Sequence, residues 1–208
     1  QKYLPKLASG EIIGSFALTE PGAGSDAGSV KTSAILDGDY YVLNGTKRYI
    51  TNAPEAGIFT VMARTDPNTP GAAGVSAFIV ERESPGLSVG RVDVKMGQQG
   101  THTADVIFED CRVPVQNRIG EEGQGFKTAM KVLDRGRLRI AGMSVGAAER
   151  LIDECISYAK ERIQFDKPIA EFQLIQAMLA DSQAETYAAR CMLMDAAHRR
   201  DKGQVIRM

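Results

Sequence analysis

The sequence predicts an α+β protein in which an antiparallel β-barrel or β-sandwich domain is followed by an antiparallel helical hairpin. Two observations support this class. Short apolar segments separated by turn residues occupy positions 1–119, and the spacing of apolar residues becomes helical beyond residue 120. We therefore expect a β domain at residues 1–119 and the first helices of an incomplete helical domain at residues 120–208.

The β domain is predicted from its turn residues. Asp37-Gly38-Asp39 and Pro85-Gly86 interrupt apolar segments, as turns between strands do. The pair Asn44-Gly45 stands between residues 40–43 and 48–51 and favours a type I′ turn, so a β-hairpin is expected there. Many short strands with no helix between them indicate a barrel or a sandwich.

The helical hairpin is predicted from apolar residues that lie three and four positions apart. Phe126, Met130 and Leu133 begin this pattern, and residues 151–159 continue it along one face. Pro168 interrupts the pattern, as proline does within a helix, and residues 174–192 resume it. Two helices leave a second apolar face that needs further helices, so we expect the chain to be part of a longer protein.

The composition is that of an ordinary globular protein of 208 residues, 43% of them hydrophobic and 25% charged. A formal net charge of −1 gives no reason to expect nucleic acid or an anionic membrane surface as a partner. No segment approaches the ~20 apolar residues of a membrane span. The first residues also do not resemble a signal peptide.

Neither cysteine nor histidine indicates a disulfide framework or a metal site. Cys111, Cys155 and Cys191 are odd in number and far apart, which favours free thiols in a reducing compartment. His102 and His198 are also far apart, and no cysteine or acidic partner stands near either at ligand spacing. We therefore expect no metal.

A glycine-rich loop at residues 19–26, Thr-Glu-Pro-Gly-Ala-Gly-Ser-Asp, follows an apolar strand-like run. Gly22 and Gly24 remove Cβ atoms where backbone must approach something closely, and they permit positive φ. Successive backbone N–H groups in such a loop form an anion site, beside which Thr19 and Ser25 add hydroxyls. The loop lacks the Gly-x-Gly-x-x-Gly dinucleotide fingerprint. It indicates a phosphate-bearing ligand, with a polar surface turn as the alternative.

Residues 17–26 resemble the signature of the acyl-CoA dehydrogenases, flavoproteins that desaturate acyl thioesters. Further segments resemble that family in the same order, at residues 47–52, 95–97 with 106–114, and 158–165. The resemblance covers essentially the whole chain, from Gln1 to Met208.

The resemblance implies a fold, a cofactor and partners. In this family a helical domain precedes a middle β domain that binds flavin and acyl-CoA, and a four-helix bundle follows. It implies FAD as cofactor, acyl-CoA as substrate and an electron-transfer flavoprotein as electron acceptor. A homo-oligomer, either a dimer or a homotetramer, is also implied. An oxidoreductase of fatty acid metabolism would lie in the cytoplasm of a bacterium or the mitochondrial matrix of a eukaryote.

The resemblance also assigns cofactor-binding residues. Those from the β domain line the pyrimidine side, the pyrophosphate and the N5 side of FAD, and they are Phe16, Leu18, Thr19, Gly24, Ser25, Tyr49 and Thr51. Arg162, Phe165 and Gln173 match residues that reach the FAD of another subunit. Tyr49 stands where the family more usually has Trp, and its alternative role is to fill space between strands. Asp166 and Phe172 stand where Gly and His are usual.

The resemblance assigns the substrate to Ser25, Asp134 and Arg137, with a charged helix face of i,i+3 pairs as the alternative for the last two. No catalytic residue is assigned. One branch of the family has its base at the position of Gly136, and the commoner branch has it in a later segment. A catalytically silent flavin-binding scaffold therefore remains an alternative to a dehydrogenase. An acyl-CoA oxidase is a second alternative, because the sequence does not identify the residues that control access of oxygen to the flavin.

Overall fold

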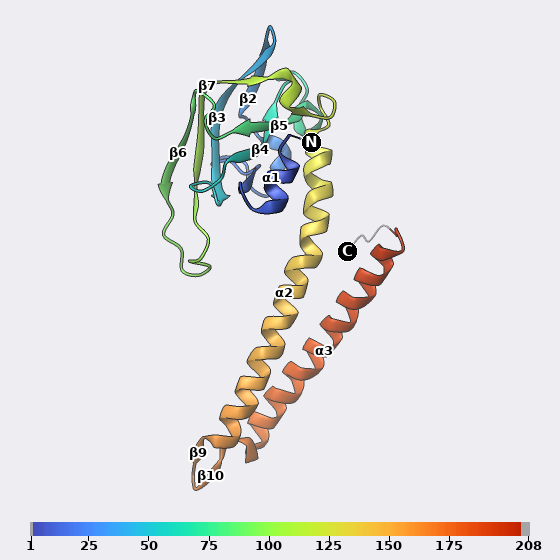
Figure 1. Ribbon diagram of the computed structural model, residues 1–208. Helices are drawn as coiled ribbons and strands as arrows, with labels where there is room; N and C mark the ends of the chain where they lie inside the picture. The colour runs from blue at the N-terminus through green and yellow to red at the C-terminus, as the bar shows by residue number, and fades with distance from the viewer. Residues whose placement is uncertain (1, 205–208) are drawn as a thin grey trace. The chain divides into compact units, whose positions relative to one another are not determined.

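The computed structural model describes residues 2–204, and its contacts divide the chain into two compact units, Gln1–Lys131 and Val132–Met208 (Figure 1). The first unit consists of a short helix and a sheet, with the elements α1 (Leu4–Ser9), β1 (Gly14–Ala17), β2 (Ser33–Asp37), β3 (Tyr40–Thr51), β4 (Ile58–Arg64), β5 (Val75–Glu81), β6 (Leu87–Val92), β7 (Thr103–Pro114) and β8 (Arg118–Ile119). The second unit contains most of α2 (Gly125–Glu161), then β9 (Ile163–Gln164), β10 (Lys167–Pro168) and α3 (Gln173–Asp201).

The sheet of the first unit is open and mixed. Its strand order is β6-β7-β3-β2-β4-β5-β8, and β1 adds to β4 beside this path. Most neighbouring strands are antiparallel, whereas β1 and β2 each run parallel to β4. The α+β class is therefore confirmed, but the sheet is not the closed, purely antiparallel barrel that was one of the two expected forms.

The core of the sheet is built from large apolar side chains that are almost completely buried. Phe59, Phe78, Phe108 and Leu43 are each at most 2% exposed. Burying one such side chain stabilises the folded state by about 1.5–3 kcal/mol. β4 and β5 are buried on both faces along most of their length, and they position β1 at the edge where the glycine-rich loop begins.

The expected hairpin at Asn44-Gly45 is wrong, because both residues lie inside the continuous strand β3. The hairpin turn is instead at Gly38, between β2 and β3. Gly45 has a φ of 147° and sits at a register shift between β3 and β7. A Cβ atom there would lie 2.6 Å from Thr32 Oγ1, so the glycine permits close packing against Thr32.

The helical hairpin forms as expected in the second unit. Arg190 Nη1 on α3 lies 2.7 Å from Glu149 Oε1 on α2, and Leu193 lies beside Gly142. Increasing residue numbers on one helix meet decreasing numbers on the other, so the two helices are antiparallel. Large apolar side chains of both helices remain more than half exposed, among them Met143, Leu151, Tyr187 and Met192. Within residues 2–204, no helix has the length and apolar character to cross a membrane.

Candidate functional site

The structure brings together the two β-domain segments that carry the predicted cofactor residues. Ser15 Oγ donates a hydrogen bond to the Thr51 carbonyl at 2.7 Å, and the Arg48 N–H donates to the Thr19 carbonyl at 2.8 Å. Residues 15–19 therefore run side by side with residues 51–48 in opposite directions. Phe16, Leu18 and Thr19 thus lie on the segment next to the one that carries Tyr49 and Thr51. In the sequence, the glycine-rich loop and β2 lie between these two segments.

The glycine-rich loop begins with a tight turn. The backbone groups of Glu20 and Ala23 bond each other in both directions, with N···O distances of 3.0 and 3.2 Å. The backbone N–H groups of Gly24, Ser25 and Asp26 donate to no acceptor within the described residues. Three consecutive free donors on an exposed loop can contribute to an anion site.

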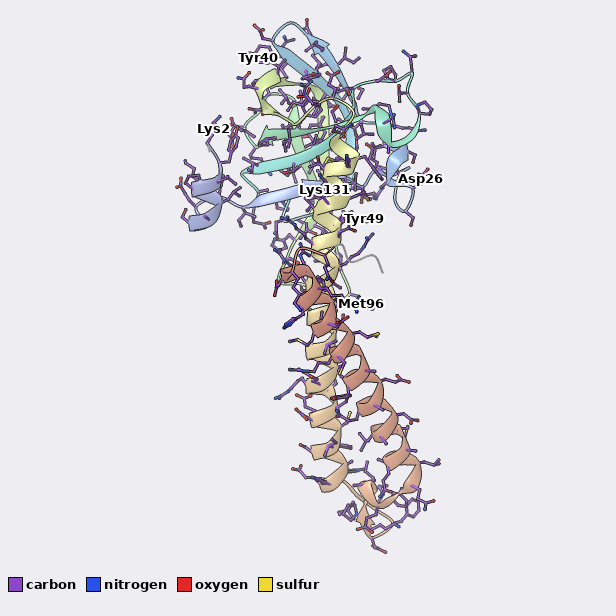
Figure 2. The ribbon with its side chains drawn as sticks, turned by 90° about the vertical axis from the view of Figure 1, so that its right-hand side faces the viewer. Lys2, Asp26, Tyr40, Tyr49, Met96 and Lys131 are labelled. Carbon is purple, nitrogen blue, oxygen red and sulfur yellow. The ribbon has the colours of Figure 1, made fainter. Side chains whose placement is uncertain are left out.

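Gly22 and Gly24 do not use the positive φ that glycine permits. A Cβ atom at either position would meet nothing within 4 Å, so no protein contact requires glycine there. The missing side chains instead leave the outer side of the loop open, and an approaching ligand would occupy that space. Figure 2 shows Asp26 at the outer end of this loop.

Tyr49 has a backbone conformation that is rare for a bulky residue. Its φ is 58°, and it lies in a register shift between Lys47 and Ile50 on β3. Its side chain is 61% exposed, and the Arg48 guanidinium lies 5.3 Å from the ring centroid (Figure 2). A space-filling residue between strands would be buried, so this alternative is not what the structure shows. Left-handed backbone at a bulky side chain is strained and is concentrated at ligand sites.

The other predicted residues of this surface differ in exposure. Phe16 and Thr19 are half-buried, Thr51 and Ser25 are exposed, and Leu18 is 6% exposed. Leu18 can therefore offer a ligand its backbone rather than its side chain, and its role in binding FAD stays a prediction.

Sequence reasoning missed a buried ion pair beneath this surface. Lys47 Nζ lies 2.8 Å from Glu20 Oε1, with the Lys47 side chain fully buried and that of Glu20 6% exposed. Burial opposes ionisation of Glu20, but Lys47 and the N–H donors around the carboxylate outweigh it and lower the pKa. Burial lowers the pKa of Lys47, and Glu20 opposes that shift. Because lysine is usually exposed, nothing in the local pattern around Lys47 indicates its burial.

A second missed residue is Arg64, at the end of β4. Its guanidinium donates to four backbone carbonyls, those of Gly28, Val30, Thr69 and Gly71, at 2.9 to 3.1 Å. No carboxylate lies within ion-pair distance of it in the described part of the chain. Arg64 thus holds residues 28–30, which follow the glycine-rich loop, against the β4–β5 connection.

In the second unit, Asp134 and Arg137 form an ion pair with each other at 2.5 Å, and both side chains are at least 60% exposed. This is the i,i+3 geometry of the alternative interpretation, and it leaves the guanidinium and the carboxylate accessible from solvent. Their role in binding substrate stays a prediction.

Arg162 and Phe165 lie in the connection between α2 and α3, and Gln173 follows it. Phe165 and Asp166 have φ values of 55° and 62°, forming the turn between β9 and β10. Phe165 is 88% exposed, and its ring centroid is 6.2 Å from that of Phe172. Gln173 begins α3. An aromatic ring held in solvent on a strained turn suits contact with another molecule, and the predicted role across subunits remains untested.

The described residues offer little for other chemistry. Among residues 2–204, no group of three or more His, Cys, Asp or Glu side chains is placed to hold a metal ion. Cys111, Cys155 and Cys191 are free thiols, and burial raises the pKa of Cys111 to about 11. Glu20 is committed to Lys47, and Glu109 lies on an exposed part of β7.

Comparisons with known proteins identify the family of this chain. Residues 15–111 match the family model for the acyl-CoA dehydrogenase middle domain, and residues 123–208 match that for the C-terminal domain. Acryloyl-CoA reductase (NADH) of Anaerotignum propionicum is 50% identical over 98% of this chain and 52% of that protein. Subunit CarC of the caffeyl-CoA reductase–Etf complex of Acetobacterium woodii is 49% identical over 95% of this chain and 52% of that protein.

A solved structure has the same fold at similar coverage. The acyl-CoA dehydrogenase of Geobacillus kaustophilus aligns with a TM-score of 0.96 and 40% identity, over 99% of this chain and 55% of that one. The chain spans about half the length of the curated relatives it matches. Two domain models of one family together cover most of the sequence, so the chain belongs to the acyl-CoA dehydrogenase family.

Proposed function

We propose that the protein containing this chain is a FAD-dependent oxidoreductase that interconverts an acyl-CoA thioester and its 2-enoyl-CoA. The observation that carries this proposal is the surface formed by the two adjacent segments, 15–19 and 48–51, with a loop of free N–H donors at one end. Membership of the family supports the reaction class, and the surface supports the cofactor.

The residues of this surface fit FAD. Three unpaired backbone donors suit a pyrophosphate, and the open side of Gly22 and Gly24 gives it access. The exposed Tyr49 ring offers an aromatic face to a planar group such as the isoalloxazine ring. Thr19 and Thr51 add hydroxyl groups that can donate to ring nitrogens and oxygens.

The chain's own residues bind, orient and shield. Bound FAD would accept a hydride from the β carbon of the thioester. The Leu18 and Thr19 segment would orient the flavin by backbone groups, and Tyr49 would cover one face and limit the access of water. Arg137 would bring positive charge toward the thioester region, if Asp134 releases it when CoA binds.

We assign no catalytic base in this chain. A base must reach the α proton of the bound thioester, and efficient transfer requires a positioned carboxylate. Gly136 occupies the position used by one branch of the family and has no side chain to ionise. We propose that the base comes from the part of the protein that this chain does not include.

A second candidate is the same chemistry run in the reducing direction, from enoyl-CoA to acyl-CoA. Two relatives that are 49–50% identical to the chain are named reductases, and one is a subunit of a reductase–Etf complex. We therefore propose an electron-transfer flavoprotein as the redox partner in either direction. We also propose a homo-oligomer, in the cytoplasm of a bacterium or the mitochondrial matrix of a eukaryote.

The proposal is tested by anaerobic titration of the full-length protein with a panel of acyl-CoA thioesters, followed by flavin absorbance in the visible range. Bleaching by one class of chain supports acyl-CoA oxidation and names the substrate. The reduced protein is then mixed with enoyl-CoA esters, and recovery of absorbance measures the reverse reaction. Tight binding of esters with no absorbance change in either direction contradicts the proposal and favours a silent scaffold, whereas rapid reoxidation by air favours an oxidase.

A further inference from the structure

A buried ion pair lies between the glycine-rich loop and β3. Lys47 is fully buried and Glu20 is 7% exposed, so neither side chain is available to a ligand in solvent. Removing two charges from water is costly, and replacing a buried ion pair by apolar residues of similar volume is often neutral or stabilising. Stability alone is therefore a weak explanation for this pair.

Lys47 bonds the backbone of the predicted flavin-side segment. Its Nζ donates to the Leu18 carbonyl at 3.1 Å as well as to Glu20. Arg48, the next residue on β3, donates its backbone N–H to the Thr19 carbonyl at 2.8 Å. Two consecutive residues of β3 thus fix two consecutive carbonyls of the neighbouring segment, immediately before Tyr49.

Glu20 also fixes the segment that leads from the glycine-rich loop to β2. Its two carboxylate oxygens accept hydrogen bonds from the backbone N–H groups of Lys31 and Thr32, at 2.6 and 2.9 Å. Thr32 in turn packs against Gly45 on β3, where there is no room for a Cβ atom. One carboxylate therefore links the start of the loop, the segment before β2 and β3.

We propose that Lys47 and Glu20 are positioning residues for the cofactor, which they hold in place without touching it. They fix the positions of Leu18, Thr19 and the free N–H donors relative to Tyr49 on β3. This inference rests on the FAD site proposed above. The charge-assisted hydrogen bonds of this pair tolerate little displacement, because hydrogen bonds are directional and the surroundings are dry.

The test compares variants of the full-length protein in which the pair is neutralised together. Glu20→Gln with Lys47→Met keeps the volume of both side chains, removes both charges and leaves the Leu18 carbonyl without its donor. We expect this double variant to fold, to bind FAD about tenfold more weakly than the wild type, and to show a shifted flavin absorption maximum and reduction potential. Either single variant leaves one buried charge without its partner and is expected to lose stability as well.

A matched control separates positioning from general stability. Tyr41 is 3% exposed, and its hydroxyl donates to Glu122 and accepts from Arg118 Nη1 at 3.0 Å, elsewhere on the same sheet. Tyr41→Phe removes these partly buried hydrogen bonds, so we expect a lower thermal midpoint with an unchanged FAD dissociation constant and flavin spectrum.

A conservative variant decides the matter if the double variant does not fold. Glu20→Asp keeps both charges but shortens the side chain by one methylene, so it displaces the loop without creating an unpaired charge. We expect it to fold and to shift the flavin spectrum and affinity in the same direction. Wild-type affinity and spectrum in Glu20→Asp, or in a folded double variant, overturn the positioning role alone. A wild-type protein that binds no FAD overturns the proposed function as well.

Discussion

A substitution at Gly24 tests whether the glycine-rich loop lies next to the cofactor. A Cβ atom there meets no protein atom within 4 Å, so Gly24→Val should not disturb the fold of the ligand-free protein. Its branched side chain would occupy the open side of the loop, where we propose that the FAD pyrophosphate lies. We expect the purified full-length variant to lose most of its bound FAD, measured by the absorbance ratio at flavin and protein wavelengths.

Gly100→Val is the matched control for this substitution. Gly100 also has ordinary φ and open space around its Cβ position, but it lies in the connection between β6 and β7. The control should retain FAD at the wild-type ratio. A Gly24→Val protein that is yellow and fully loaded would show that the loop does not approach the cofactor.

The residues of the candidate site were only partly accessible from the sequence. The local string at residues 19–26 indicated a phosphate loop, because glycine and hydroxyl residues follow one another there. Lys47 and Arg64 were not predicted, since their partners are carbonyls and a carboxylate from distant segments. No local pattern identifies a buried cation, because its surroundings are assembled only when the sheet forms.

At the scale of an element, two residues of the β9–β10 turn have a backbone conformation that glycine adopts more easily than residues with a side chain. Phe165 and Asp166 both have positive φ, where the preferred second residue is glycine. We expect Asp166→Gly to stabilise the protein by up to about 1 kcal/mol, because glycine adopts this conformation without a Cβ clash. The measurement is the thermal midpoint of the full-length protein.

Asp181→Gly is the control for the turn. Asp181 is exposed within α3, so glycine there should destabilise the helix by about 0.5 kcal/mol. If Asp166→Gly also lowers the thermal midpoint, the Asp166 side chain makes a contact that outweighs the backbone strain.

Elements that depend on local sequence patterns were predicted correctly, whereas features that depend on pairing between distant segments were not. Helical spacing is local, so the two helices and the break near Pro168 were found from the sequence. The turn at Asn44-Gly45 was predicted wrongly, because its preference for a turn was overridden by pairing of β3 with β7, far along the chain. The parallel pairing of β1 with β4 is non-local as well, and no residue pattern distinguishes it from an antiparallel neighbour.

At the scale of the whole molecule, Arg162 tests whether one subunit completes the cofactor site of another. Its side chain is exposed and has no ion-pair partner within residues 2–204, so Arg162→Ala should leave the protomer stability unchanged. We expect FAD affinity to fall about tenfold. Arg150→Ala on α2 removes only a surface pair with Glu154 and should leave FAD affinity unchanged.

Mixed oligomers show whether this effect crosses subunits. A Gly24→Val subunit keeps Arg162, and an Arg162→Ala subunit keeps an intact glycine loop. After the two are unfolded and refolded together, we expect part of the FAD binding to return, because some sites combine both intact parts. If normal oligomers form but FAD binding does not recover, Arg162 does not complete the site of another subunit. It then either acts in the site of its own subunit or takes no part in FAD binding.

The Arg64 guanidinium is surrounded by four carbonyls, and this has an electrostatic consequence for the segment that Arg64 holds. A carbonyl is a dipole, so it occupies a hydrogen of the guanidinium without cancelling the net charge. The partly buried cation therefore places a positive potential beside the backbone of residues 28–30. Such a potential acts over several ångströms and is weakened by salt less than that of an exposed lysine. We expect this potential to attract the pyrophosphate of the proposed FAD site before the loop contacts it.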